Sequence, residues 1–66
     1  MKKYVLKDAS GSSLYTNEDP ASIADKLRFM EEHDIAIDDM TVMTIDTEKY
    51  PPATETAKEF LKRNRL

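Results

Sequence analysis

Apolar and polar residues alternate along residues 40–46, which makes this segment the best strand candidate in the chain. On a period of two, Met40 and Val42 share one face, while Met43 and Ile45 share the other. Both faces of the strand therefore carry apolar side chains. Because a small antiparallel sheet usually buries one face and leaves the other in water, the second apolar face predicts either helices on both sides or contact with a second chain.

The first seventeen residues predict a β-hairpin. Alternation indicates strands over about residues 2–8 and 13–17, and Gly11, the only glycine in the chain, is expected to adopt a positive φ between them. With a strand order of 2-1-3, residues 40–46 would lie at the sheet edge, antiparallel to the first strand. Such an edge, apolar on both faces and without lysine or proline inside it, is poorly protected against pairing with another chain.

The pattern over about residues 19–33 predicts a first helix. Asp19 is a favoured cap, and Pro20 fits the first turn, where its missing N–H costs nothing. Phe29 lies about 120° away from the apolar stripe, so we expect it either to pack against the hairpin or to be an exposed contact residue. The stripe itself contains Ile23, Ala24, Leu27 and Met30.

A second helix is predicted over about residues 53–65. The preceding Pro51-Pro52 is expected to prevent any continuation of a strand, because proline has no N–H to donate. Thr56 and Glu59 have the spacing of a capping box, which applies if the helix begins late. The predicted stripe contains Ala53, Ala57, Phe60 and Leu61.

These elements predict one small α+β domain of ββαβα order, with a three-stranded antiparallel sheet and two helices packed mainly on one face. One helix on each face is the alternative, and it would hide all the apolar groups within a monomer. A chain of 66 residues has little material for three layers. We therefore favour two layers and a homodimer formed through the uncovered face or through an edge strand. The interface candidates are Val5, Tyr15, Phe29, Met43 and Ile45.

The residue types that carry chemistry are sparse. The chain has no cysteine, which excludes disulfides and thiolate zinc sites and is typical of a reducing compartment, so we expect a cytoplasmic protein without a targeting or membrane segment. One glycine cannot build a phosphate-binding loop, and the serines lack a nucleophile motif. His33 and its acidic neighbours fit a solvated helix end better than a metal site. We therefore predict no enzyme activity, cofactor, metal or small-molecule substrate.

The charge is unevenly distributed along the chain. Residues 18–48 carry ten acids against two basic residues (−8), whereas residues 1–17 carry +2 and residues 49–66 carry +3, within a net charge of −3. The acidic segment could imitate nucleic acid or dock on a basic protein. The basic C-terminal helix offers nucleic-acid binding as the alternative function, although cations at a helix C-terminus also offset its dipole. The candidate residues are Lys58, Lys62, Arg63 and Arg65.

The best functional prediction is a small regulatory or accessory domain of bacterial or phage type. It would act by binding another protein, and we expect it to be a homodimer.

Overall fold

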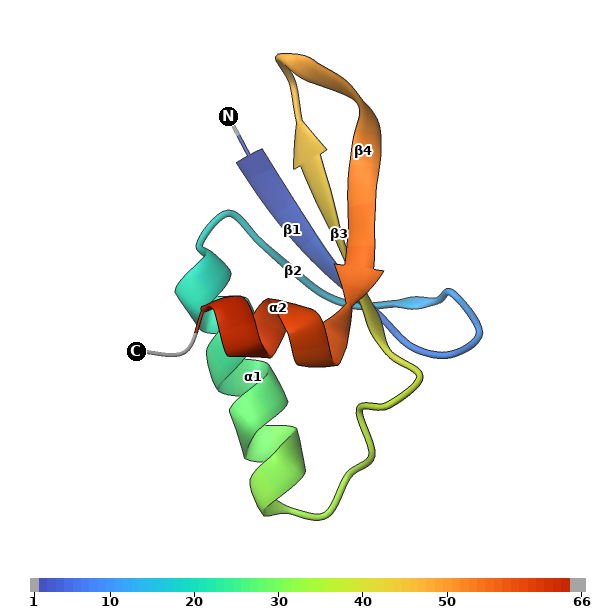
Figure 1. The fold of residues 1–66 in the computed structure, drawn as a ribbon, viewed down its shortest axis with the longest axis vertical. Coiled ribbons are helices and arrows are strands. Elements are labelled where there is room, and N and C mark those ends of the chain that lie inside the picture. Colours follow the sequence, from blue (N-terminus) through green and yellow to red (C-terminus); the bar gives the residue numbers. More distant parts are fainter. Residues whose placement is uncertain (1, 65–66) are drawn as a thin grey trace.

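The computed structural model describes residues 2–64, apart from the side chains of residues 49 and 50. It confirms a small α+β domain with two helices and an antiparallel sheet (Figure 1). The elements are β1 (Lys2–Lys7), β2 (Ser13–Asn17), α1 (Pro20–Glu32), β3 (Thr41–Asp46), β4 (Lys49–Thr56) and α2 (Ala57–Arg63). The predicted three strands and ββαβα order are wrong, because the sheet has four strands in the order β2-β1-β3-β4 and the chain reads ββαββα.

The additional strand, β4, contains the two prolines that were expected to prevent it. Its ladder with β3 shifts register, so that a single β3 residue, Ile45, faces residues 50–52 of β4. Proline is tolerated at bulges and on edge strands, where a missing N–H breaks no regular ladder bond. Pro51-Pro52 therefore interrupts the pairing locally without ending the strand. As a result β3 lies inside the sheet, and the predicted edge position of residues 40–46 is wrong.

The second helix begins later than residue 53 because β4 occupies residues 49–56. Thr56 then caps α2, its Oγ1 accepting the Glu59 backbone N–H at 3.2 Å. This cap supplies one of the hydrogen bonds that the first helical turn cannot make internally. The predicted start near residue 53 is therefore wrong, and Ala53 belongs to the strand and not to the helical stripe. The spacing of Thr56 and Glu59, which applied only to a late start, is the cap that the helix uses.

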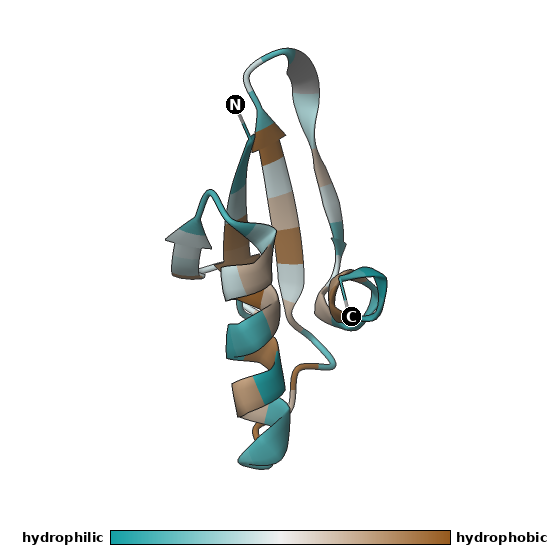
Figure 2. Ribbon diagram, turned by 90° about the vertical axis from the view of Figure 1, so that its left-hand side faces the viewer, coloured by the Kyte–Doolittle hydropathy of each residue, from teal (hydrophilic) through white to brown (hydrophobic). Residues whose placement is uncertain are grey.

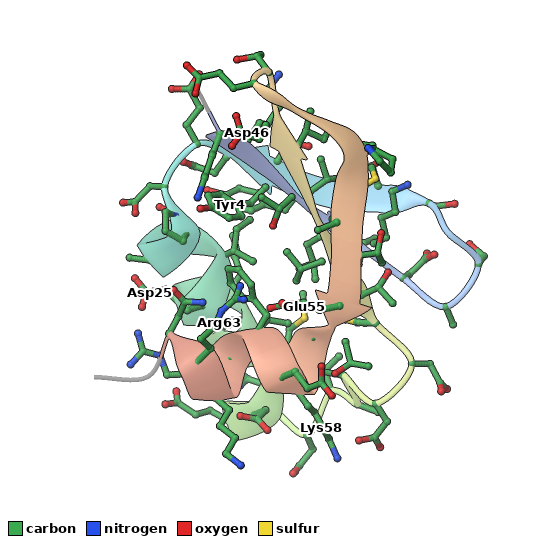
Figure 3. The ribbon with its side chains drawn as sticks, turned by 45° about the horizontal axis from the view of Figure 1, so that its top comes forward. Tyr4, Asp25, Asp46, Glu55, Lys58 and Arg63 are labelled. Carbon is green, nitrogen blue, oxygen red and sulfur yellow. The ribbon has the colours of Figure 1, made fainter. Side chains whose placement is uncertain are left out.

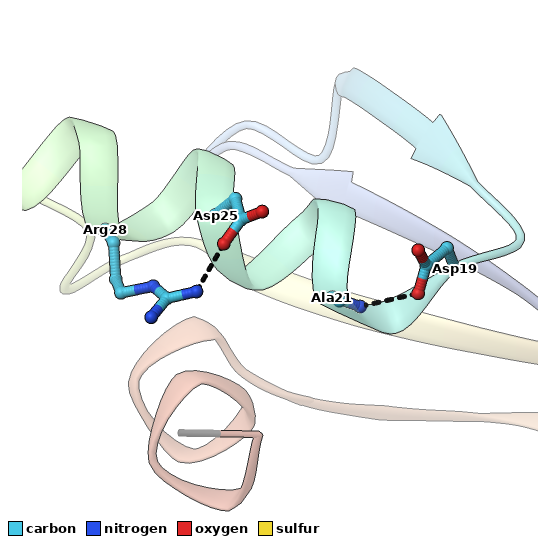
Figure 4. Close-up of polar contacts among 4 residues, drawn as sticks. All are labelled: Asp19, Ala21, Asp25 and Arg28. Atoms are coloured by element: carbon cyan, nitrogen blue, oxygen red, sulfur yellow. Dashed lines mark hydrogen bonds and ion pairs between the residues drawn. The ribbon is translucent and has the colours of Figure 1, made fainter. Parts of the chain in front are cut away.

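Both ends of α1 follow local rules. Asp19 Oδ1 accepts the Ala21 N–H at 3.0 Å (Figure 4), so the predicted start is confirmed. At the other end the Ile35 N–H donates to the Met30 carbonyl at 2.8 Å, and the Asp34 N–H donates to Glu31. This is the Schellman arrangement, which usually places glycine in the left-handed position. Here Asp34 takes it, with φ of 58°.

The loop between β1 and β2 is organised around one carboxylate. Asp8 Oδ1 accepts hydrogen bonds from the Ser10 hydroxyl at 2.6 Å and from the Ser12 N–H at 3.0 Å. The Ser10 hydroxyl bond, followed by the backbone bond from Ser12, lowers the pKa of Asp8 below its ordinary value. Gly11 has φ of 89°, which confirms the expected positive φ.

The core lies between one face of the sheet and both helices. α1 packs over β1 and β2, and α2 packs over β3 and β4, so both helices meet the same face (Figures 1 and 2). Leu6 and Val42 are paired across β1 and β3 and point into this core. The helices contribute Ile23, Ala24, Leu27, Ala57, Phe60 and Leu61, all buried. The predicted stripes are thus confirmed at these positions.

Candidate protein-binding surface

The sheet has a second face, which points away from both helices. In the β1–β3 ladder Val5 lies opposite Met43, and Lys3 lies opposite Ile45. Because side chains alternate across a strand, these residues project away from the core that contains Leu6. We call this surface the open face. Its members are Lys3, Val5 and Lys7 of β1, Thr16 of β2, Thr41, Met43 and Ile45 of β3, and Thr54 of β4.

The middle of the open face is apolar. Val5 is only 6% exposed although neither α1 nor α2 packs on this side, because side chains of the neighbouring strands shield it. Met43 and Ile45 are half-buried beside it. Figure 2 shows hydrophobic stretches along β3 that are separated by a paler position. The structure therefore brings three of the five interface candidates together on one surface.

The border of the open face carries charge and hydroxyl groups. Lys3 and Lys7 lie on either side of Val5 along β1. At one corner Glu18 joins Lys3 and Ile45 in lining a shallow cavity of about 310 Å³. The two lysines of β1 that belong to the open face are thus placed next to its apolar centre. The surface combines a hydrophobic middle with a positive border.

Tyr15 and Phe29, the other two interface candidates, are not on the open face. Tyr15 points to the helix side, where Lys26 Nζ of α1 lies 5.0 Å from its ring centroid. Phe29 is 56% exposed, and its ring lies 4.2 Å from that of His33. The two aromatic residues share a groove of about 280 Å³ beside the outer edge of β2. We call this surface the edge patch, which consists of Tyr15, Ser22, Asp25, Lys26 and Phe29.

A further groove, of about 410 Å³, lies on the helix side, between the sheet and the C-terminal end of α2. Tyr4, Glu55 and Arg63 all line it (Figure 3). Arg63 Nη2 lies 2.9 Å from Glu55 Oε1, an ion pair whose angle is unsuited to a hydrogen bond. With Lys2 and Asp46, the groove holds two cations and two carboxylates. The sequence did not reveal this groove, because residues 53–56 were assigned to a helix.

Two of the cations proposed for nucleic-acid binding form ion pairs with carboxylates. Lys58 pairs with Asp38, and the hydrogen bond and charge of that carboxylate raise the pKa of Lys58. Arg63 pairs with Glu55, as described above. Lys62 is exposed on α2, and Arg65 lies outside the described residues. These pairs reduce the positive charge that α2 offers to phosphates.

Neither a metal cluster nor a membrane helix is found in residues 2–64. No three acidic or histidine side chains in this range are close enough together to hold an ion. His33 instead rests against the ring of Phe29. Neither α1 nor α2 combines the length and the hydrophobicity that a membrane crossing requires.

Comparison with known proteins gives no family for the chain. No protein-family model matches it, and the searches of curated proteins and of solved structures found no significant match. The functional argument therefore rests on the geometry of the surfaces described above.

Proposed function

We propose that this protein is a small non-catalytic interaction domain that binds another protein through the open face. The observation that carries the proposal is the contiguous apolar centre of Val5, Met43 and Ile45 on a side of the sheet that neither helix covers. Apolar patches rimmed by polar groups commonly mark protein-binding surfaces. A four-stranded sheet also presents this centre on a rigid support.

The chemistry of the open face favours a partner with apolar and acidic side chains. Lys3 and Lys7 border the apolar centre and would attract carboxylates. None of the members of the open face is acidic, so a second copy stacked on it would supply no carboxylate to pair with these lysines. We therefore assign the open face to a different protein. A regulatory or accessory role fits a domain of this size that acts by binding.

The test compares proteins captured from the native cells by the wild type and by Met43→Glu. The substitution places a carboxylate in the apolar centre, so the affinity for a direct partner should fall at least about tenfold, which corresponds to about 1.4 kcal/mol of binding free energy. Ile35→Glu is the matched control, because Ile35 is 45% exposed on the loop after α1. Quantitative mass spectrometry measures the captured proteins. The purified partner should then bind the wild type and Ile35→Glu more tightly than Met43→Glu.

The proposal fails if Met43→Glu retains every partner of the wild type. It also fails if Ile35→Glu loses the same partners, since loss would then reflect added negative charge and not the open face. Circular dichroism must show that both variants remain folded.

A further inference from the structure

The open face offers an incoming chain no backbone hydrogen bonds. β1 and β3 are the two inner strands of the sheet, and each is paired with a neighbour on both sides. An extended segment laid across Val5 and Met43 would leave its own N–H and C=O groups facing apolar side chains without partners, which is costly. An α-helix pairs these groups internally. The apolar centre therefore suits an occupant whose backbone is already hydrogen-bonded, which is either a helix or a second sheet.

The width of the apolar centre favours a helix over a sheet. At the level of Val5 the strand pairing aligns one residue from each strand, in the order Thr16, Val5, Met43 and Thr54, and both threonines are exposed. With strands about 4.8 Å apart, the apolar pair forms a strip about 10 Å wide, close to the diameter of about 10–12 Å of one helix. A second sheet would also cover the two threonine hydroxyls, and buried hydroxyls need hydrogen-bond partners. A single helix lying along β1 and β3 leaves both hydroxyls in water.

The two charges of the open face are both positive and have no acidic partner among the described side chains. Lys3 and Lys7 lie on either side of Val5 along β1, and neither forms an ion pair there, although Glu18 lines a cavity with Lys3. The four-residue step from Lys3 to Lys7 spans about 13 Å of strand. On a helix, residues seven positions apart share one side and lie about 10.5 Å apart, a difference that the long lysine side chains can span. Carboxylates two turns apart on a partner helix are therefore complementary to both lysines.

We propose that the partner of the open face contributes an amphipathic, acidic α-helix that lies along β1 and β3. Its apolar residues cover Val5, Met43 and Ile45, and its carboxylates, two turns apart, pair with Lys3 and Lys7. The helix forms a third layer on the side of the sheet opposite α1 and α2. This assignment rests on the proposed function, to which it adds the structural class and the charge pattern of the partner.

Three designed peptides of about 18 residues test the proposal on the full chain; at this length a helix has about five turns. The first carries leucines three and four positions apart, with two glutamates seven positions apart beside the leucine stripe. The second replaces both glutamates by lysine, and the third orders the residues of the first as an apolar–polar alternation, which favours a strand. Calorimetry should show the first peptide binding at least about tenfold more tightly than the other two. Its largest NMR shifts should fall on the amides of Val5, Met43 and Ile45.

A reversal of both lysines tests the charge pattern. The double variant Lys3→Glu with Lys7→Glu should bind the lysine peptide more tightly than the glutamate peptide, because every facing charge is then exchanged. The matched control, Lys26→Glu with Lys62→Glu, changes the net charge equally at exposed positions of α1 and α2, and it should keep the wild-type ranking. A reversed ranking is a gain of binding to one peptide, so loss of folding cannot produce it.

Several results would overturn the acidic helix as the occupant. These are tightest binding by the alternating peptide, equal binding of the glutamate and lysine peptides to the wild type, no binding of any peptide at millimolar concentration, and NMR shifts confined to surfaces other than the open face. If Met43→Glu loses its cellular partners in the same study, the proposed function stands and only the helix is refuted. If Met43→Glu keeps every cellular partner while the peptides rank as expected, the proposed function fails and the preference of the open face for an acidic helix stands.

Discussion

Two phenylalanines in this chain provide a matched test of how burial determines stability. Phe60 of α2 is fully buried, with its ring 5.8 Å from that of Tyr4, whereas Phe29 of α1 is 56% exposed. Both belong to helices and both contact another ring. Phe60→Ala and Phe29→Ala therefore remove the same atoms from opposite environments.

The expected costs differ by several kcal/mol. Replacing a buried phenylalanine by alanine typically costs about 3–5 kcal/mol, to which the lost pairing with Tyr4 adds about 0.5–1.5 kcal/mol. A core in a chain of this size contributes only about 3–5 kcal/mol of net stability. Phe60→Ala should therefore be largely unfolded at 25 °C. Phe29→Ala should change the free energy of unfolding by about 0.5 kcal/mol or less.

Urea unfolding followed by circular dichroism measures both effects. Because Phe60→Ala leaves little folded protein, Phe60→Leu supplies a value that can be fitted, with an expected loss of about 1–2 kcal/mol. The reasoning is refuted if Phe29→Ala costs as much as Phe60→Leu, or if Phe60→Ala retains the wild-type midpoint. A large loss in Phe29→Ala that depends on protein concentration would instead report on dimerisation, so all measurements are made at matched dilution.

Three further predictions concern local structure. Gly11→Ala should lower the free energy of unfolding by about 1–2 kcal/mol through its φ of 89° alone, since a Cβ there meets no atom within 4 Å. Asp34→Gly should raise the free energy of unfolding by up to about 1 kcal/mol, because Asp34 also has a positive φ. Urea midpoints that move in the same direction in both variants would contradict this. Thr56→Ala should lower the free energy of unfolding by about 1 kcal/mol in the same assay, whereas Thr56→Ser keeps the hydroxyl that caps α2. Equal losses of stability in the two variants would exclude the hydroxyl as the cause. The pKa of Asp8, measured by NMR titration, should lie below 3.8 and rise in Ser10→Ala. Because the pKa of Asp8 is lower in the folded than in the unfolded protein, its hydrogen bonds stabilise the fold above the unfolded pKa, and this stabilisation is lost as pH falls through the folded pKa. An Asp8 with an unshifted pKa would contradict the prediction.

Local rules determined much of the fold. The Asp19-Pro20 start of α1, the turn at Gly11 and the buried stripe of Ile23 and Leu27 all follow from residue type and spacing. These features depend on neighbours within about one helical turn or one tight loop. The sequence also indicated correctly that β3 has an apolar outer face. It did not reveal that Asp34 would replace the usual glycine at the end of α1.

Tertiary structure decided the rest, because pairing between distant strands outweighed local preference. Pro51-Pro52 locally opposes a strand, yet the bulge opposite Ile45 lets β4 pair with β3 on either side of the prolines. That pairing moved β3 from the edge to the interior and made β2 and β4 the two edges of the sheet. It also shortened α2. The sequence thus determined which residues are apolar and where helices can begin, while long-range packing determined which apolar residues form the core and which face solvent.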